Sequence, residues 1–371
     1  MENRAIPDRY HLNESEYGIT TGSAATAAAL AALLSIKGEV ETVNIETPFG
    51  ELNIRVEVSK TLNTYSGRAS VIKYPYNDPD VTKNLEIFAD VIITQTPGIT
   101  VKGGTGVGRV TKPGLQVPVG EAAINPTPRE MIISNLSKNI PDGMGAEVTI
   151  CVPAGEELAK KTLNPRLGIL DGISILGTTG FARSMNLKSY KTSYRCQIDV
   201  AVAEGYTDLV FVPGNIGERI AKSILKVHDD QVVQMGNFVG YMLNEAGKED
   251  VKSITLLGHA GKLIKISAGI FNTKHSIADG RREIIAVHSA LSGADKKLIT
   301  EIFKSNTTEE MIALLEEHSI IQTVFNSIAE RIKIVCSERF KIDFDVIIVN
   351  MKGDVLNNNH KTPIISKKGI K

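Results

Sequence analysis

The pattern of hydrophobic and polar positions changes about half-way along the chain. In the first half, residues 40–47 and 52–58 alternate apolar and polar side chains on either side of a Pro- and Gly-containing turn, which predicts a β-hairpin. In the second half, short apolar runs such as 209–212 and 253–257 alternate with helical segments, which is typical of a parallel sheet covered by helices. We therefore predict two domains, an α+β domain over residues 1–190 and an α/β domain over residues 191–371.

The same pattern predicts the other elements. Strands are expected at 69–74, 91–95, 145–152, 231–236 and 346–349, and helices at 24–35, 128–139, 156–163, 184–204, 218–227, 238–246, 281–291, 296–303, 308–317 and 322–340. Residues 24–35 are almost all Ala and Leu, and Thr21 or Ser23 is the expected N-cap of that helix. Residues 1–16 are expected to form a polar arm. Residues 98–128 carry many glycines and prolines without periodicity, and such a long irregular segment more often has a function than not.

The amino-acid composition limits the classes of molecule that the protein is expected to bind. A chain of 371 residues is long enough for two domains, as the pattern predicts. Lys plus Arg equals Asp plus Glu at 42 each, there is no Trp, and aromatic residues make up 5%. The protein therefore has neither the net positive charge that attracts the phosphate backbone nor many aromatic side chains for base stacking. We expect no nucleic-acid partner.

Cysteine usage and the N-terminal region indicate a reduced, cytoplasmic protein. Cys151, Cys196 and Cys336 lie far apart, so the sequence predicts neither a disulfide framework nor a zinc site. Residues 1–16 have no apolar core of a signal peptide, and the apolar run at 24–34 is too short to span a bilayer. We expect no membrane partner. The sequence leaves the oligomeric state open, a homo-oligomer included.

Two glycine turns follow predicted strands of the second half. Gly214 is expected to let the backbone turn, and Gly217 to let a helix begin close to a ligand; Gly258 opens a similar turn. The G-x-x-G spacing is a weak signal and is also that of a plain strand-to-helix turn. Since ligands of open parallel sheets bind at the carboxyl ends of strands, we place a cofactor against Gly214, Asn215, Gly217 and Gly258.

Candidate catalytic groups are few. His259 is a candidate acid or base and Lys262 a carboxylate binder, although His259 could equally hydrogen-bond locally and Lys262 begin a helix in solvent. The motif at 78–82 places Asp80 beside a second carboxylate, a weak signal for catalysis and too few ligands for a metal. A further polar loop could grip carboxylates or lie in solvent; it contains His275, Asp279, Arg281 and Arg282.

The block 102–131 combines flexible backbone with local positive charge. Its glycines, at 103, 104, 106 and 108, permit close backbone approach or a positive φ. Its cations are opposed only by Glu121, and they are Lys102, Arg109, Lys112 and Arg129. Such a loop suits a large polyanion, and no G-K-[ST] follows to make it a P-loop. The alternative is a structured loop with incidental charges.

Several segments in order resemble one family. They are GITTGSAATAAALAA at 18–32, DPDVT at 78–82, the block at 103–131, GISILGTTG at 172–180, PGNIGE at 213–218, MGNFVG at 235–240, GHAGKLIKISAG at 258–269 and ADGR at 278–281. Together they resemble the cobalt-precorrin-5B C-1 methyltransferases of anaerobic cobalamin (vitamin B12) biosynthesis. The likeness runs from about residue 18 to residue 356.

The resemblance implies an enzyme that methylates ring carbon C-1 of cobalt-precorrin-5B to give cobalt-precorrin-6A. It implies S-adenosyl-L-methionine as methyl donor and a cobalt-bearing tetrapyrrole as acceptor, so the cobalt belongs to the substrate and no metal bound by the protein is required. It also implies a C-terminal Rossmann-like domain, which would bind the donor. The candidates to bind the acceptor are Lys102, Gly103, Gly104, Arg109, Lys112, Arg129, Thr20 and Thr21.

The chain departs from the family pattern in three places. Lys274 precedes His275 where the family has His directly, so the resemblance assigns His275 no role. Residues 181–185 read FARSM where V-x-P-M is usual after Gly180. Asn84 stands where a Gly is frequent, and Asn tolerates the left-handed conformation that such a turn needs.

Two other function classes stay open at this stage. A nicotinamide-dependent dehydrogenase could use the same α/β domain, but the chain lacks G-x-G-x-x-G and the acidic residue that would bind the ribose. A non-enzymatic corrinoid carrier would bind the macrocycle without transferring a methyl group. The sequence identifies no general base.

Overall fold

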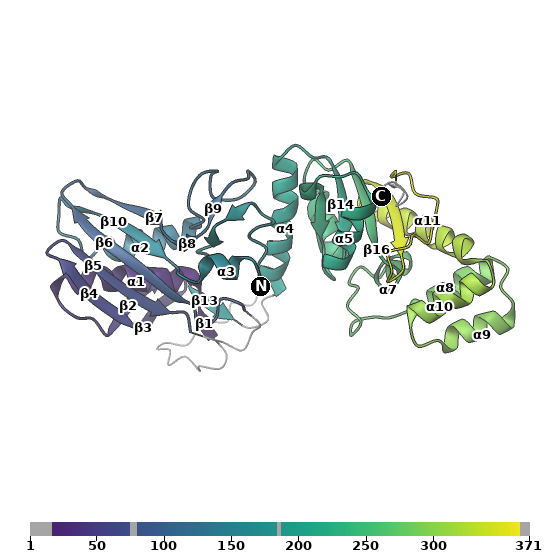
Figure 1. Cartoon of the computed structure of the whole chain (residues 1–371), viewed down its shortest axis with the longest axis horizontal. Helices are drawn as coiled ribbons and strands as arrows, with labels where there is room; N and C mark the ends of the chain where they lie inside the picture. The colour runs from purple at the N-terminus through teal and green to yellow at the C-terminus, as the bar shows by residue number, and fades with distance from the viewer. Residues whose placement is uncertain (1–16, 75–79, 184–186, 364–371) are drawn as a thin grey trace, which may run out of the picture. The chain divides into compact units, whose positions relative to one another are not determined.

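The computed structural model describes residues 17–74, 80–183 and 187–363 (Figure 1). The predicted N-terminal arm, the first two residues of the 78–82 motif and Ser184 and Met185 of the divergent segment lie outside these ranges. The chain forms two compact units, Met1–Leu187 and Lys188–Lys371. Each unit has its own hydrophobic core.

Unit 1 is built on a buried helix packed against a mostly antiparallel sheet. Helix α1 (Thr21–Leu34) has only Leu34 outside its buried set, because Ala, Gly and Leu occupy every side of it. A helix without a polar face has to lie in a core. It packs on β5 (Ser66–Ile72) and β6 (Glu86–Thr94), and Gly67 of β5 leaves room for the carbonyl of Ala32. The side chain of Thr20 caps the helix by accepting from the N–H of Ser23, so the predicted cap at Thr21 or Ser23 was wrong.

The main sheet of unit 1 has five strands in the order β4-β5-β6-β10-β7. Their bounds are β4 Val58–Asn63, β5 Ser66–Ile72, β6 Glu86–Thr94, β10 Gly145–Cys151 and β7 Gly98–Gly103. Strand β7 pairs parallel with β10, although its segment was predicted to be irregular. It is an edge strand with a mixed burial pattern, which explains why no clear period-2 signal marks it.

Smaller elements complete unit 1. The predicted hairpin is confirmed as β2 (Thr42–Thr47) paired antiparallel with β3 (Gly50–Arg55). Short strand pairs join distant segments: β1 (Tyr17–Ile19) with β13 (Phe181–Arg183), β8 (Gly106–Val107) with β12 (Gly172–Ile173), and β9 (Arg109–Val110) with β11 (Ile169–Leu170). The helices are α2 (Pro126–Ser137), α3 (Gly155–Ala159) and the short η1 (Ser35–Lys37).

Unit 2 contains the predicted parallel sheet, with four strands in the order β15-β14-β16-β17. The strands are β14 (Asp208–Val212), β15 (Val232–Gln234), β16 (Ser253–His259) and β17 (Asp343–Val349). They are buried on both faces, since alternate residues of one strand join different cores. Phe211 belongs to the core shared with helices α4 (Leu187–Ala203), α6 (Val239–Ala246) and α11 (Ile321–Arg339), whereas Val210 and Val212 belong to the core shared with α5 (Asn215–Ile224). This is why each strand reads as a continuous apolar run.

The helices of unit 2 follow the predicted positions closely. They are α4 (Leu187–Ala203), α5 (Asn215–Ile224), α6 (Val239–Ala246), α7 (Ala260–Leu263), α8 (Arg281–Leu291), α9 (Lys296–Lys304), α10 (Thr308–Glu317) and α11 (Ile321–Arg339), with short turns η2 (Asp229–Gln231) and η3 (Ile264–Ala268). None of the helices in the described part of the chain combines the length and apolar character that crossing a bilayer requires.

Candidate functional site

The order of the strands in unit 2 marks one edge of its sheet as the place for a ligand. In chain order, β14 is the first strand, with the second strand β15 on one side of it and the third, β16, on the other. The connections that leave β14 and β16 therefore diverge. In open parallel sheets, ligands bind in the crevice where the strand order reverses, outside the carboxyl ends of the strands. The turns after β14 and β16 meet this description.

Gly214, between β14 and α5, faces open space. A Cβ built on it would have no heavy atom within 4 Å. The chain bends here, as expected, but the φ of 165° at Gly214 is extended backbone that any residue adopts, so the bend does not require a glycine. Asn215 follows as the first residue of α5, and its Oδ1 accepts a hydrogen bond of 2.6 Å from the amide of Gln234. The first turn of α5 is thus tied to the end of β15.

Gly217 and Gly258 serve packing, which differs from the role expected for Gly217. A Cβ on Gly217 would lie 3.1 Å from the Cβ of Val212, so this glycine lets α5 lie against its own sheet. A Cβ on Gly258 would lie 2.7 Å from the ring of Pro213. The two glycine turns are therefore pressed together through Pro213, and of the four positions Gly214 and the exposed Asn215 are open to a ligand.

His259 is held by two hydrogen bonds. Its Nδ1 accepts from the N–H of Gly261 at 3.1 Å, which caps α7, and its Nε2 lies 2.8 Å from Oε1 of Glu309. Because Nδ1 is an acceptor, the proton of the neutral ring is on Nε2 and points to Glu309. The local hydrogen bonding that was the alternative prediction for His259 is present. The sequence did not indicate Glu309.

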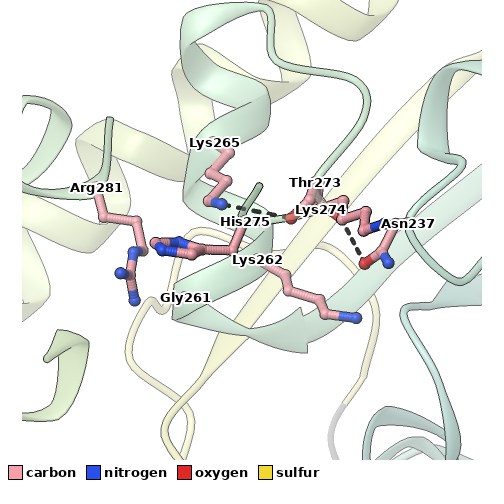
Figure 2. Close-up of a pocket in the computed structure, with 8 residues that line it drawn as sticks. All are labelled: Asn237, Gly261, Lys262, Lys265, Thr273, Lys274, His275 and Arg281. Atoms are coloured by element: carbon pink, nitrogen blue, oxygen red, sulfur yellow. Dashed lines mark hydrogen bonds between the residues drawn. The ribbon is translucent and has the colours of Figure 1, made fainter. Parts of the chain in front are cut away.

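A pocket of about 460 Å³ opens beside the end of β16 (Figure 2). It is lined by Asn237, Gly261, Lys262, Lys265, Thr273, Lys274, His275 and Arg281. The structure thus brings together Lys262, His275 and Arg281, which the sequence had singled out in two separate segments. Lys265 and Asn237 were missed. The only sequence signal for Lys265 is its spacing of three residues from Lys262, which places both on one side of a helical turn.

Lys265 is the buried cation of this pocket, with 2% of its surface exposed. Its Nζ donates to the carbonyl oxygens of Thr273 at 3.3 Å and Ala278 at 2.8 Å, which fastens the loop that carries Lys274 and His275. Burial lowers the pKa of Lys265, whereas Asp279 raises it. The ammonium is thus satisfied by carbonyl dipoles and has no carboxylate within ion-pair distance in the described residues.

Asp279 and Arg281 form a two-pronged ion pair at the pocket wall. Nε of Arg281 donates to one carboxylate oxygen and Nη2 donates to the other at 2.8 Å. Nη1 of Arg281 also donates to Thr308 at 3.3 Å. The hydrogen bonds from Arg281 lower the pKa of Asp279 from 3.8 to about 2. The paired geometry makes Arg281 a fixed part of the wall.

We expect this ion pair to make stability depend on pH in strong acid. The pKa of Asp279 is depressed in the folded state, so its contribution is present above pH 3.8 and is lost as the pH falls toward about 2. The carboxylate is 38% exposed, which limits the effect to about 1 kcal/mol after screening by solvent. Urea unfolding of Asp279→Asn and the parent protein at a series of pH values measures it. The difference between them should shrink below pH 3.8, and a constant difference would contradict the prediction.

The glycines of the 102–131 block pack against the chain itself. A Cβ on Gly103 would lie 2.6 Å from Ala122, and one on Gly104 would overlap the sulfur of Cys151. Gly106 has a φ of +72°, and a Cβ there would overlap the carbonyl oxygen of Val152. The predicted close approach and positive φ are confirmed at these glycines, but it is the protein's own backbone that approaches.

The cations of that block already have partners in the protein. Lys102 pairs with Glu147 at 2.7 Å on the exposed face of the sheet. Arg109 donates to the carbonyl of Gly120, and Arg129 donates to the carbonyl of Val101 at 2.9 Å and lies 3.5 Å from Glu121. The aliphatic stem of Lys112 lies against Gly168. Arg109 and Arg129 are thus both held at the 120–121 segment.

The remaining candidates of unit 1 have structural contacts. Thr20 is the helix cap described above, and Thr21 donates to the carbonyl of Leu176 at 3.1 Å while accepting from its N–H at 2.9 Å. Asp80 pairs at 2.5 Å with Lys73, whose side chain is 3% exposed, and it accepts from Thr82. These hydrogen bonds and the Lys73 charge hold the pKa of Asp80 below its usual value against the opposing effect of burial. Asp80 is thus a stable anion tied to Lys73, an arrangement unlike that of a general base.

Known proteins place the chain in a family. Residues 9–184 match the family described as CbiD, and residues 272–360 match the family described as CbiD, C-terminal domain. The chain is 52% identical over 363 residues to the cobalt-precorrin-5B C(1)-methyltransferase of Methanosphaera stadtmanae, with 96% of each chain covered. This chain belongs to the CbiD family. It is also 50% identical to the enzyme of the same name from Methanobrevibacter smithii, which covers 94% of this chain and 98% of that relative.

A solved CbiD structure is also similar. The crystal structure of a cobalamin biosynthesis protein, CbiD, from Archaeoglobus fulgidus is 30% identical, and the match covers 71% of this chain and 83% of that one with a TM-score of 0.38. The resemblance seen in the sequence motifs is confirmed by the family matches. The described residues of this CbiD chain contain no cluster of three or more His, Cys, Asp and Glu side chains that could hold a metal ion.

Proposed function

We propose that this CbiD-family chain is a methyltransferase that adds a methyl group to ring carbon C-1 of cobalt-precorrin-5B in cobalamin biosynthesis. The observation that carries the proposal is the identity of about half of the residues, over nearly the whole length, to relatives that bear this enzyme name. The product would be cobalt-precorrin-6A. The cobalt is part of the substrate.

The proposed donor is S-adenosylmethionine, bound by residues 191–371 acting as a Rossmann-like domain. Gly214 supports this, because its missing side chain leaves open space at the strand-order reversal and beside the free N–H groups of α5. We propose that Gly214 and Asn215 contact the donor. Gly217 and Gly258 shape the same site from behind, by letting α5 and Pro213 lie against the sheet. The bound donor supplies an electrophilic methyl group on sulfur.

Methyl transfer from S-adenosylmethionine needs no activated nucleophile among the side chains of the protein. The S–CH3 bond breaks as the bond to the electron-rich ring carbon forms, and the donor leaves as a neutral thioether. The protein has to align the two reactants and keep water away. This agrees with the site, where His259 is engaged with Gly261 and Glu309 and no activated nucleophile stands beside it in the described residues.

The acceptor carries acetate and propionate groups, for which cations are the natural partners. We propose that Lys102, Arg109, Lys112 and Arg129 contact them. The ion pair of Lys102 is about half exposed, so exchanging Glu147 for a substrate carboxylate changes the free energy little. Gly103, Gly104, Thr20 and Thr21 would then contribute through the fold of unit 1 and not through contact.

Anaerobic incubation with cobalt-precorrin-5B and methyl-labelled S-adenosylmethionine tests the function. We expect the product mass to rise by a single labelled methyl group. Corrinoid binding without a labelled product would indicate a carrier, and tight binding of NADH with no methyl transfer would indicate a dehydrogenase.

Calorimetric titration with S-adenosylhomocysteine tests the donor site. Gly214→Val adds a side chain in open space on extended backbone, so the variant should fold normally. Its affinity for S-adenosylhomocysteine should fall about tenfold or more. Gly217→Val is not informative, because its side chain would strike Val212 in the core. Unchanged affinity in folded Gly214→Val would rule out contact at this glycine.

A further inference from the structure

The pocket beside β16 holds more positive charge than the protein neutralises. Asp279 pairs with Arg281 and cancels one charge. The ammonium groups of Lys262, Lys265 and Lys274 have no carboxylate within ion-pair distance among the described residues. Figure 2 shows Lys265 bonded to Thr273, whereas Lys262 bonds none of the other residues drawn.

Lys262 is the side chain whose state calls for a ligand. It is half-buried, and it has no hydrogen-bond or ion-pair partner in the described part of the chain. Burial lowers the pKa of its ammonium, and the charge of Lys265 lowers that pKa further. Removing a cation from water beside another cation is unfavourable unless an anion compensates both. The protein therefore maintains this arrangement at the expense of stability.

The volume and the charge of the pocket indicate which kind of anion it can bind. About 460 Å³ is room for a small-molecule group and too little for a folded partner to enter. Asn237 and Thr273 add neutral polar atoms, and the fixed Arg281 closes one side. Ammonium groups on flexible stems around such a space suit carboxylates that hang from a larger ring.

Between the two proposed reactants, the charge favours the acceptor. S-adenosylmethionine carries an ammonium and a sulfonium against its single carboxylate, so its net charge is positive and a lysine-lined pocket repels it. The acceptor carries several carboxylates and no fixed cation on its rim. Coulomb interactions of either sign are strengthened in a half-buried pocket relative to water.

We propose that this pocket, with Lys262 as its principal ligand, binds acetate or propionate carboxylates of the tetrapyrrole acceptor. This rests on the proposed function for the identity of the acceptor. The proposal explains why Lys262 is left without a protein partner.

The test uses the full chain and uroporphyrin III, a stable tetrapyrrole with acetate and propionate side chains, titrated by its absorbance. Lys262→Gln should weaken its binding about tenfold or more, because a charge-assisted hydrogen bond is lost. Lys262→Arg should restore most of the affinity. Lys297→Gln, which removes the same charge from a side chain that is 83% exposed on α9, is the matched control and should bind like the parent.

Two further measurements separate ligand binding from a structural role. The melting temperature of Lys262→Gln should equal or exceed that of the parent, since the change removes an unpaired, partly buried charge. Its affinity for S-adenosylhomocysteine should be unchanged. A lower melting temperature, an equal loss in Lys297→Gln, unchanged uroporphyrin binding or weakened S-adenosylhomocysteine binding would each overturn the proposal.

Failure of this proposal can be told from failure of the proposed function. If the parent transfers no methyl group but binds uroporphyrin III through Lys262, the carboxylate site stands and the reaction is different. If the parent methylates cobalt-precorrin-5B and Lys262→Gln binds uroporphyrin III as tightly as the parent, the reaction stands and the pocket has no part in holding the acceptor.

Discussion

Replacing Gly106 by Ala should destabilise unit 1 by about 4 kcal/mol or more, a loss large enough to unfold many domains. Gly106 has a φ of +72°, and its Cβ would overlap the carbonyl oxygen of Val152. The same carbonyl region is fixed by a 2.7 Å hydrogen bond from the N–H of Val152 to Thr105. Gly155 and Gly172 also lie against the backbone of Gly106, and the nitrogen of Gly155 is 3.2 Å from the position of the added Cβ. The added methyl group therefore has no direction in which to relieve the overlap.

Gly143→Ala is the matched control for that variant. Gly143 has a similar φ of +80°, but a Cβ on it would meet no atom within 4 Å. It should cost only the left-handed conformation, about 1–2 kcal/mol. Urea unfolding followed by circular dichroism gives both values. Equal losses in the two variants would show that the stack of Gly106, Gly155 and Gly172 relaxes, and would contradict the prediction.

Replacing Phe211 by Ala should destabilise unit 2 by about 3–5 kcal/mol. Phe211 lies in β14, at the centre of the sheet, and is 0% exposed. It packs in the core shared by α4, α6 and α11, so its removal leaves a cavity that rigid elements on several sides cannot close. Hydrogen exchange read by mass spectrometry should show faster exchange throughout residues 188–363 and unchanged exchange in unit 1.

Phe303→Ala serves as its control. Phe303 lies in α9 and is 51% exposed, so deleting the ring should change the unfolding free energy by no more than about 0.5 kcal/mol. A similar loss in both variants would mean that the effect follows from the loss of an aromatic residue and not from the cavity under β14.

Elements with a strong local pattern were predictable from the sequence. The strands and helices of unit 2 lie within a few residues of their predicted bounds, because a buried parallel strand is a short apolar run and its helices keep a 3.6-residue period. The left-handed conformation predicted for Asn84 is confirmed by its φ of 59°. Strand β7 was missed, since an edge strand with a mixed burial pattern carries little period-2 signal.

The candidate site was predictable only in part. Glycine positions in the 102–131 block and in the two turns of unit 2 were recognised, but the atoms that occupy the space beside each glycine were not. Gly106 meets Val152, and Gly258 meets Pro213, across gaps of more than forty residues in the chain. A sequence pattern shows that a side chain is absent, whereas only the folded chain shows what fills its place.

The sequence by itself determined the family, the two-part organisation and the parallel sheet, because motifs and hydrophobic periods are local properties of the chain. The tertiary structure decided which groups are free to act. His259 pairs with Glu309, and Asp80 pairs with Lys73. Gly214 faces open space, and Lys262 has no partner among the described residues. The hydrogen bonds and ion pairs of a side chain depend on distances between segments that are remote in sequence. The effects of charge and burial on that side chain depend on the same distances.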